Sequence, residues 1–350
     1  MKTEYLAIMP SEEEANRVGL RRAGEIIRSG GLVVFPTETV YGLGADATSA
    51  AAARLIYAAK GRPSDNPLIV HIADPLDAER YTCVSDAYRR LAERFMPGPL
   101  TVILPVKDNA IPKTVTAGLD TVAVRCPSHP IARALINEAG VPIAAPSANL
   151  SGSPSPTCFR HVREDMDSRV DMIIDGGDCD IGVESTIVKL EESGEAILLR
   201  PGKITVRELS EVLGEIRIAA SVTAALGEGE TVYSPGMKYR HYAPKCPVFL
   251  LKGDEKSRQK YISEENGNIA ILSYSEYVSV YRDLIPSLAV YDFGSEAAPS
   301  EQAKRLFYLL READKQGYDR IYAPLPDTDG ISLALYNRMI RAAAYTVIEV

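Results

Sequence analysis

Residues 60–72 read Lys-Gly-Arg-Pro-Ser-Asp-Asn-Pro-Leu-Ile-Val-His-Ile. This stretch joins the end of an alanine-rich helix, expected over Thr48–Ala59, to a short apolar strand, expected over Leu68–Ile72. The strand is apolar on both faces, as in a sheet that is covered by helices. The same alternation of helices with short apolar strands recurs along the chain and predicts an α/β fold.

Working outward, Ser11–Glu14 fits a capping box that opens a helix running to about Ser29, and Gly30–Gly31 would end it. Further helices are expected near 85–96 and 131–139. Strands are expected at Leu32–Pro36, Leu100–Val106, Val122–Cys126, Pro142–Ala145, Met172–Ile174, Thr186–Leu190 and Ala196–Leu199.

The chain changes character after residue 217. Residues 218–246 are rich in Gly, Ser and Pro and lack a helical or strand period, so they are expected to form a linker between domains 1–217 and 247–350. The second domain is expected to be smaller and built from βαβ units, with strands at Val248–Leu251, Ile269–Ser273, Leu288–Phe293, Ile321–Ala323 and Thr346–Val350, and helices at Ser300–Gln316 and Ile331–Ala344. The linker contains Lys238, Tyr239 and His241, which either contact a ligand or pack between the domains.

Composition narrows the class of protein. The 350 residues carry a formal net charge of −8, and neither half is basic, which argues against a binder of duplex nucleic acid. Five cysteines without a CxxC pair indicate neither a disulfide framework nor a zinc site. The polar start, Met1–Arg22, is not typical of a signal peptide, and no apolar run is long enough to span a membrane, so we expect a cytoplasmic protein.

Polar residues follow several of the expected strands. Pro36-Thr-Glu-Thr-Val-Tyr-Gly42 places hydroxyls, a carboxylate and a phenol where open α/β sheets bind ligands, although an ordinary strand-to-turn exit would also select them. Gly42-Leu-Gly44 fits a loose dinucleotide-binding pattern, but residues intervene between strand and glycines, and turn glycines are the preferred interpretation.

Basic residues stand at other element ends. Lys60 and Arg62 either interact with a helix dipole or bind neighbouring phosphate oxygens, for which a point charge and a planar fork are suited. Asn66 follows them, and His71 is either a satisfied core residue or a ligand contact. Arg125 and Arg200 end strands and are candidates for binding a carboxylate or phosphate, with ordinary surface arginines as the alternative.

The segment Ala145-Pro-Ser-Ala-Asn149 leaves another strand and enters the loop Ser151–Thr157. Ser147 and Asn149 can present a hydroxyl and an amide to one ligand, although turn chemistry would select the same residues. No P-loop, catalytic serine triad or HExxH motif is present. The residues therefore indicate a site that positions and neutralises anions, which is what phosphoryl and nucleotidyl transfer require.

Five of these segments together resemble the YrdC/Sua5 family of threonylcarbamoyl-AMP synthases. They are Pro36–Gly44, Lys60–Pro63, Asn66–His71, Pro146–Asn149 and Glu184–Val188. The family signature, KxR followed by SxN, corresponds to Lys60, Arg62, Ser147 and Asn149. The resemblance implies a twisted mixed sheet with helices around a concave groove, followed by a smaller Rossmann-like domain of the Sua5 type.

The resemblance also implies an activity. The enzyme would be a nucleotidyltransferase that condenses L-threonine, bicarbonate or carbon dioxide, and ATP to threonylcarbamoyl-AMP and pyrophosphate, for N6-threonylcarbamoyladenosine at position 37 of tRNA. Mg²⁺ would bind through the ATP phosphates without a direct protein ligand. Downstream threonylcarbamoyl-transferase proteins would be partners, whereas strong tRNA binding and membrane attachment are not expected.

Site residues follow from the motifs. The resemblance implies that the four signature residues are catalytic and also bind ATP, together with Asn66, Thr121, Ser155, Arg200 and, in the linker, Lys238, Tyr239 and His241. It implies a threonine site formed by Thr37, Thr39, His71, Arg125, Ala145 and Ser185. The linker would close as a lid.

Two other functions stay open on the sequence. The same concave surface could serve a module that binds structured RNA. The fold could also host a different carbamoyltransferase that uses ATP or carbamoyl phosphate.

Overall fold

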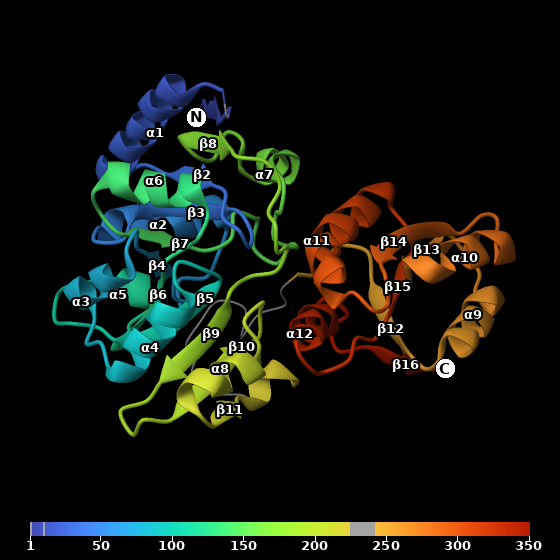
Figure 1. Ribbon diagram of the computed structural model, residues 1–350. Coiled ribbons are helices and arrows are strands. Elements are labelled where there is room, and N and C mark those ends of the chain that lie inside the picture. The colour runs from blue at the N-terminus through green and yellow to red at the C-terminus, as the bar shows by residue number, and fades with distance from the viewer. Residues whose placement is uncertain (1, 10, 225–241) are drawn as a thin grey trace. The chain divides into compact units, whose positions relative to one another are not determined.

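The computed structural model describes residues 2–9, 11–224 and 242–350 (Figure 1). The described residues divide into two compact units. The first contains residues up to 151 and from 155 to 224, and the second contains residues 152–154 and 242–350. The predicted α/β class is confirmed in both units.

The first unit is built on a mixed sheet of eleven strands, in the order β1-β8-β2-β3-β7-β4-β6-β5-β9-β10-β11. The sheet contains both parallel and antiparallel strand pairs. For example, β4 is parallel to β6 on one side and antiparallel to β7 on the other. The strands are β1 Glu4–Ala7, β2 Val33–Phe35, β3 Gly42–Asp46, β4 Ile69–His71, β5 Leu100–Pro105, β6 Thr121–Arg125, β7 Ile143–Ala145, β8 Met172–Asp175, β9 Thr186–Leu190, β10 Ala196–Arg200 and β11 Ile216–Ile218.

Helices separate many of these strands. They are α1 Glu13–Arg28, α2 Ala50–Lys60, α3 Ala78–Tyr81, α4 Asp86–Phe95, α5 Lys113–Thr116, α6 Pro130–Ala139, α7 Phe159–Met166 and α8 Val206–Leu213, with short 3₁₀ turns at Pro75–Asp77 and Ala220–Val222. Helices α1 and α6 pack side by side on β2, β7 and β8 (Figure 1), where their apolar faces form one buried cluster with Phe35, Ile143 and Ile174. None of the helices in the described part has the length and apolarity needed to span a bilayer.

The register of the central strands brings several candidate residues onto one face of the sheet. His71 pairs with Arg125, and Arg125 pairs on its other side with Thr101. Side chains two residues apart on a strand share a face. The face of Arg125 therefore also carries Ala123 and Thr121, and it includes a small apolar cluster of Ile69, Ile103, Ala123, Ile187, Ile197 and Leu199.

The second unit contains five parallel strands in the order β14-β13-β15-β12-β16. They are β12 Val248–Lys252, β13 Ile269–Tyr274, β14 Ala289–Gly294, β15 Arg320–Pro324 and β16 Val347–Glu349, connected by α9 Glu255–Glu264, a 3₁₀ turn at Ser275–Tyr277, α10 Val278–Leu284, α11 Pro299–Gln316 and α12 Ser332–Ala342. Residues of α9 and α10 pack on one face of the sheet, whereas α11 and α12 contact each other, and contact β14 and β12 respectively. The expected Rossmann-like arrangement is thereby confirmed.

Two local predictions are wrong. Helix α1 begins at Glu13, one residue later than a cap at Ser11 requires, and its N-cap residue Glu12 makes no side-chain capping bond. Gly42 and Gly44 are strand rather than turn residues. Their missing side chains make room for the Phe35 ring, because a Cβ on Gly44 would lie 2.8 Å from it and 2.7 Å from Ile143.

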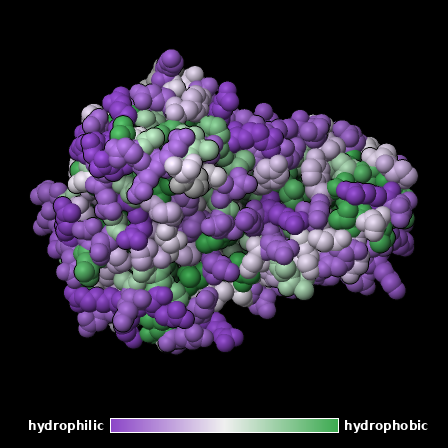
Figure 2. Space-filling model, turned by 45° about the horizontal axis from the view of Figure 1, so that its top comes forward, coloured by the Kyte–Doolittle hydropathy of each residue, from purple (hydrophilic) through white to green (hydrophobic). Residues whose placement is uncertain are grey.

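Polar residues predominate on the face of the molecule shown in Figure 2, and hydrophobic residues are scattered over it in small groups. Most of the apolar side chains are instead buried on the two sheets. The candidate site residues described next are also largely buried, which is unusual for charged side chains and demands specific partners.

Candidate active site

Three of the four signature residues, Lys60, Ser147 and Asn149, meet at the end of α2. The helix begins with a side-chain cap from Ser49 and ends at Gly61, which adopts the left-handed conformation with φ 62° and turns the chain sharply after Lys60. The Lys60 side chain, 3% exposed, donates to the carbonyl oxygens of Ser147 and Asn149, the latter at 2.5 Å, and to Asn149 Oδ1 at 3.3 Å.

The loop after β7 is held in place by its own polar side chains as well. Ser147 Oγ hydrogen-bonds Asn149 Oδ1, and Asn149 Nδ2 donates to the carbonyl oxygen of Leu150 at 2.7 Å. Lys60 therefore contributes both a positive charge and the link that holds the SxN loop against α2. The lysine of the KxR motif and both polar residues of the SxN motif thus lie together in the structure.

Arg62 and Asn66 occupy the turn between α2 and β4. Arg62 Nη2 donates to the carbonyl oxygens of Asn66 at 3.3 Å and Pro67 at 3.4 Å. The Asn66 side chain is 1% exposed, and neither its Oδ1 nor its Nδ2 has a hydrogen-bond partner among the described residues. A buried amide without partners costs about 1–3 kcal/mol, so this amide is a strong indication of a ligand contact.

Arg125 lies at the end of β6 and forms a buried ion pair. Its Nη2 donates to Glu38 Oε1 at 2.8 Å, and both side chains are less than one-tenth exposed. Arg125 Nε and Glu38 Oε2 are buried and have no hydrogen-bond partner in the part of the chain that the structure describes. The pair thus leaves one donor and one acceptor unused.

The same pair controls the protonation of its surroundings. Burial alone would raise the pKa of Glu38, but the charge and hydrogen bond of Arg125 outweigh it and hold that pKa below its usual range. Burial, together with the positive charge of Arg125, lowers the pKa of His71 to about 3. His71 is therefore a neutral imidazole at neutral pH, with Nδ1 3.1 Å from the carbonyl oxygen of Ile69.

Thr37 and Thr39 belong to the turn that carries Glu38. Their hydroxyl oxygens are 2.9 Å apart, and the Thr37 hydroxyl also donates to the carbonyl oxygen of Val40 at 2.6 Å. Both threonines are buried. These bonds fix the turn between β2 and β3 and so fix the position of Glu38.

A second cluster of polar side chains lies where β9 begins and β10 ends. Arg200 donates from Nε to the carbonyl oxygen of Ser185 at 3.0 Å and from Nη2 to its hydroxyl at 3.1 Å. The Ser185 hydroxyl is also 2.8 Å from that of Thr101, which is the strand partner of Arg125. Ser155, from the loop after the SxN motif, is 2.5 Å from Glu184 Oε1.

The remaining predicted residues lie at different positions. Ala145 ends β7 beside Ile69. Thr121 begins β6 and shares the face of Arg125, but four residues of strand, about 13 Å, separate the two. Lys238, Tyr239 and His241 fall outside the described residues.

Three residues of these polar groups were missed as individual candidates. Glu38 and Glu184 lie inside the segments Pro36–Gly44 and Glu184–Val188. A carboxylate between polar neighbours in these segments could have identified both as site residues. Thr101 lies within an apolar strand, and only the pairing of β5 with β6 and β9 brings it to the site.

Two family models match the chain, one over each of its two parts. A family model described as "Telomere recombination", Sua5_yciO_yrdC, matches residues 25–202. A second, described as "Threonylcarbamoyl-AMP synthase, C-terminal domain", matches residues 204–344.

Similar proteins span the full chain. A "Threonylcarbamoyl-AMP synthase" of Bacillus subtilis is 44% identical over 356 residues, with both chains fully covered, and one of Pyrococcus abyssi is 44% identical over 95% of this chain and 96% of its own. The crystal structure of P. abyssi Sua5 complexed with L-threonine superposes with a TM-score of 0.88 at 40% identity, covering all of both chains. The two matched models and these full-length similarities place the chain in the Sua5/YrdC family, in the form that carries the Sua5 C-terminal domain.

Proposed function

We propose that this chain is a threonylcarbamoyl-AMP synthase, which converts L-threonine, bicarbonate or carbon dioxide, and ATP to threonylcarbamoyl-AMP and pyrophosphate. The names of the full-length relatives support the reaction, and the P. abyssi complex supports threonine as a substrate. The observation that carries the assignment of the site is the buried Asn66 amide, which has neither of its hydrogen-bonding groups satisfied beside Arg62.

The end of α2 binds the triphosphate. Lys60 and Arg62 supply positive charge, and Asn66 supplies an amide donor. The three residues lie within a segment of seven residues at the end of α2. Ser147, Asn149 and Ser155 line the nucleotide end, and Thr121 and Arg200 contact ATP or its phosphates. Mg²⁺ enters with ATP, bound through the ATP phosphates. The roles proposed for the side chains in binding threonine and in the attack on ATP do not depend on that metal.

Arg125 and Glu38 orient threonine. The unused Nε of Arg125 donates to the substrate carboxylate, and the unused Oε2 of Glu38 accepts from the substrate nitrogen. Thr37, Thr39, Ala145 and Ser185 enclose the side chain, and the neutral His71 adds no second positive charge beside Arg125.

The reaction joins two anions. The threonine amine adds to carbon dioxide and loses a proton, which gives a carbamate. A carbamate oxygen then forms a bond to the α-phosphorus as the bond from that phosphorus to the bridging oxygen breaks, and pyrophosphate leaves with the electron pair. Lys60, Arg62, Arg125 and Arg200 offset the repulsion, which is the electrostatic contribution that phosphoryl-transfer chemistry needs.

We also propose where the chain acts, which proteins receive its product and how it divides into domains. The chain acts in the cytoplasm and passes its product to proteins that transfer the threonylcarbamoyl group to tRNA, without binding tRNA strongly itself. Residues 1–217 are the catalytic domain and 247–350 the Sua5-type domain. Residues 218–246 link these two domains, and the expected lid formed by Lys238, Tyr239 and His241 falls outside the described residues.

Pyrophosphate release from ATP, with threonine and bicarbonate added singly and together, tests the reaction. We expect release that requires both. Release with carbamoyl phosphate and no threonine requirement would instead indicate a different carbamoyltransferase. A folded protein that releases none but binds RNA with steep salt dependence would be an RNA-binding module.

A further inference from the structure

The second unit has a cavity of about 520 Å³ at the carboxyl edge of its parallel sheet. Its lining includes the residues that follow β12 and β15, which are neighbours in the sheet. After β12 the chain continues into α9 on one face, whereas after β15 it continues into α12 on the other. Adjacent strands whose connections leave on opposite faces form the switch point at which open α/β sheets bind ligands.

Two hydroxyl groups in the cavity lack partners. Tyr274 and Ser332 line it and are each 8% exposed. Neither hydroxyl makes a hydrogen bond within the described part of the chain, although the Tyr274 ring lies 5.7 Å from the guanidinium of Arg258. Burial raises the pKa of Tyr274 to about 12, so its phenol stays protonated. Neither hydroxyl oxygen is fully buried, so both are open to the cavity and available to a polar ligand.

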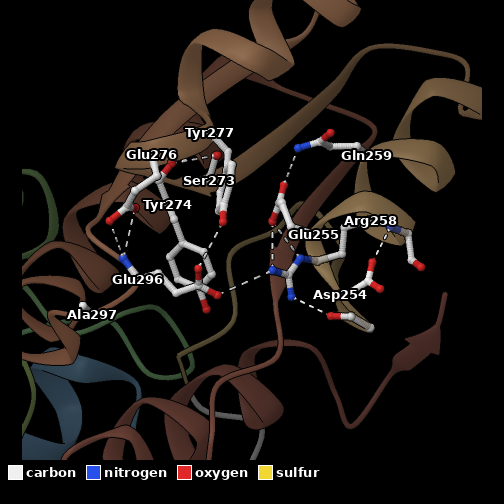
Figure 3. A network of polar contacts seen from close by, with 12 residues as sticks. Asp254, Glu255, Arg258, Gln259, Ser273, Tyr274, Glu276, Tyr277, Glu296 and Ala297 are labelled. Atoms are coloured by element: carbon white, nitrogen blue, oxygen red, sulfur yellow. Dashed lines mark hydrogen bonds and ion pairs between the residues drawn. The ribbon is translucent and has the colours of Figure 1, made fainter.

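Carboxylates of the chain itself occupy Arg258 and the start of α9 (Figure 3), whereas α11 and α12, whose first residues Pro299 and Ser332 line the cavity, have no side-chain cap within the described ranges. Asp254 caps α9 and accepts from the Ser257 amide at 2.8 Å, so a carboxylate of the chain already occupies one amide of this helix N-terminus and places negative charge beside it. Arg258 donates from Nε and Nη2 to Glu255 at 3.1 and 2.8 Å and from Nη1 to the carbonyl oxygen of Gly253 at 2.9 Å.

Negative charge remains available in the cavity. Its lining carries four carboxylates and two cations, and the second cation, Lys252, pairs with Glu349 at 2.7 Å. Glu296 reaches Arg258 only at 4.0 Å and is half exposed, and Asp327 has no ion-pair partner among the residues described. Both carboxylates line the same cavity as Tyr274, and Glu296 also accepts a hydrogen bond from the Tyr277 hydroxyl at 3.4 Å.

We propose that this cavity binds a small organic cation, with an ammonium group held between Glu296 and Asp327 and hydrogen-bonded to the hydroxyl of Tyr274. A metal ion fits less well, because no three metal-binding side chains cluster in the described ranges. The rings of Tyr274 and Tyr277 supply apolar surface for the stem of the ligand and favour a cation over their faces. The volume is within the usual range for small-molecule sites. The proposal is independent of the synthase reaction, since every residue belongs to the second unit.

Calorimetric titration of the full chain with three four-carbon probes tests the charge. The probes are 1,4-diaminobutane, 1,4-butanediol and succinate, which are cationic, neutral and anionic. We expect the diamine to saturate one site with Kd of about 1 mM or below, and the other two to bind about tenfold more weakly or worse. Succinate binding as tightly as the diamine, or no saturation by the diamine below about 20 mM, would overturn the proposal.

Variants test the location. Glu296→Gln combined with Asp327→Asn should raise Kd for the diamine by about tenfold or more, and Tyr274→Phe by about threefold. Asp283→Asn combined with Glu264→Gln, an equal change of charge at exposed positions of α10 and α9 outside the cavity, is the control for the double variant and should change Kd by less than about twofold. Circular dichroism confirms that each variant is folded. Diamine binding that persists unchanged in the folded double variant would show that the cation binds elsewhere.

Discussion

Arg125 Nη2 lies 2.8 Å from Glu38 Oε1, and both side chains are buried at the end of β6. The pair joins two segments that are 87 residues apart in the sequence and sets the charge around His71. Because one nitrogen of the arginine and one oxygen of the glutamate remain without a hydrogen bond, the pair is both a structural link and an incomplete site.

Breaking this pair should cost stability. Glu38→Gln and Arg125→Met each leave one buried group without its charge partner, and each should lower the free energy of unfolding by about 3–5 kcal/mol. The double variant should lose less than the sum of the two. Urea unfolding followed by circular dichroism measures all three. The exposed pair Lys113–Asp120, 2.6 Å apart, is the control, and its removal should leave the unfolding midpoint nearly unchanged. Strictly additive losses for the buried pair would refute the coupling.

Asn66→Leu should separate function from stability. The substitution removes an amide that has no partner in the free protein, so the free energy of unfolding should stay constant or rise by about 1 kcal/mol. The catalytic efficiency kcat/KM for ATP should fall about tenfold or more, because the triphosphate loses a donor. Steady-state kinetics and urea unfolding give the two quantities.

Asn149→Leu is the matched control for this experiment. Its amide group hydrogen-bonds Leu150, Ser147 and Lys60, so this variant should lose stability as well as activity. If Asn66→Leu destabilised the protein as strongly as Asn149→Leu, the Asn66 amide would have a structural role instead.

The neutral His71 predicts a pH dependence of stability. Its pKa is about 3 in the folded protein and about 6.5 when unfolded, so below pH 6.5 the unfolded state binds a proton that the folded state does not. Stability should therefore fall by about 1.4 kcal/mol per pH unit as pH drops through 6 to 5. Glu38 contributes in the same direction only at lower pH, because its pKa is held below the usual range.

Urea unfolding at pH 7, 6 and 5 measures this slope. His71→Asn should remove most of it, whereas His129→Asn, at a half-buried residue, should remove less. An unchanged slope in the His71 variant would mean that the imidazole is not buried in its neutral form.

Strand β3 depends on glycine at a contact with Phe35. Gly44→Ala should lower the free energy of unfolding by about 1–3 kcal/mol, because its Cβ would lie under 3.0 Å from both Phe35 and Ile143. Gly42→Ala, with its nearest contact at 3.1 Å, should cost less. Thermal unfolding ranks the two variants, and the reverse order would contradict this packing.

Much of the fold could be predicted from local pattern. The apolar run at Leu68–Ile72 contains β4, the run at Val122–Cys126 overlaps β6 with a shift of one residue, and the alanine-rich stretch Thr48–Ala59 covers all of α2 except Lys60. Local pattern did not predict strand β3, Gly42–Asp46, because glycine is a poor strand former. Gly42 and Gly44 stand in this strand because the Phe35 ring packs against them and leaves no room for a side chain.

The candidate site was predictable where motifs supplied its residues. The contact of Lys60 with Ser147 and Asn149 joins two signature segments. The pairing of Arg125 with Glu38 and that of Thr101 with Ser185 were not predictable, because each depends on strand register between segments distant in sequence.

The most direct measurement of the central claim follows the carbon of ¹³C-bicarbonate. The chain is incubated with ATP and threonine, and the products are identified by mass spectrometry and ¹³C NMR. We expect labelled threonylcarbamoyl-AMP that forms only when all three substrates are present and is strongly reduced in Asn66→Leu. AMP or ADP released without a labelled adduct, by a folded protein under the same conditions, would contradict the central claim.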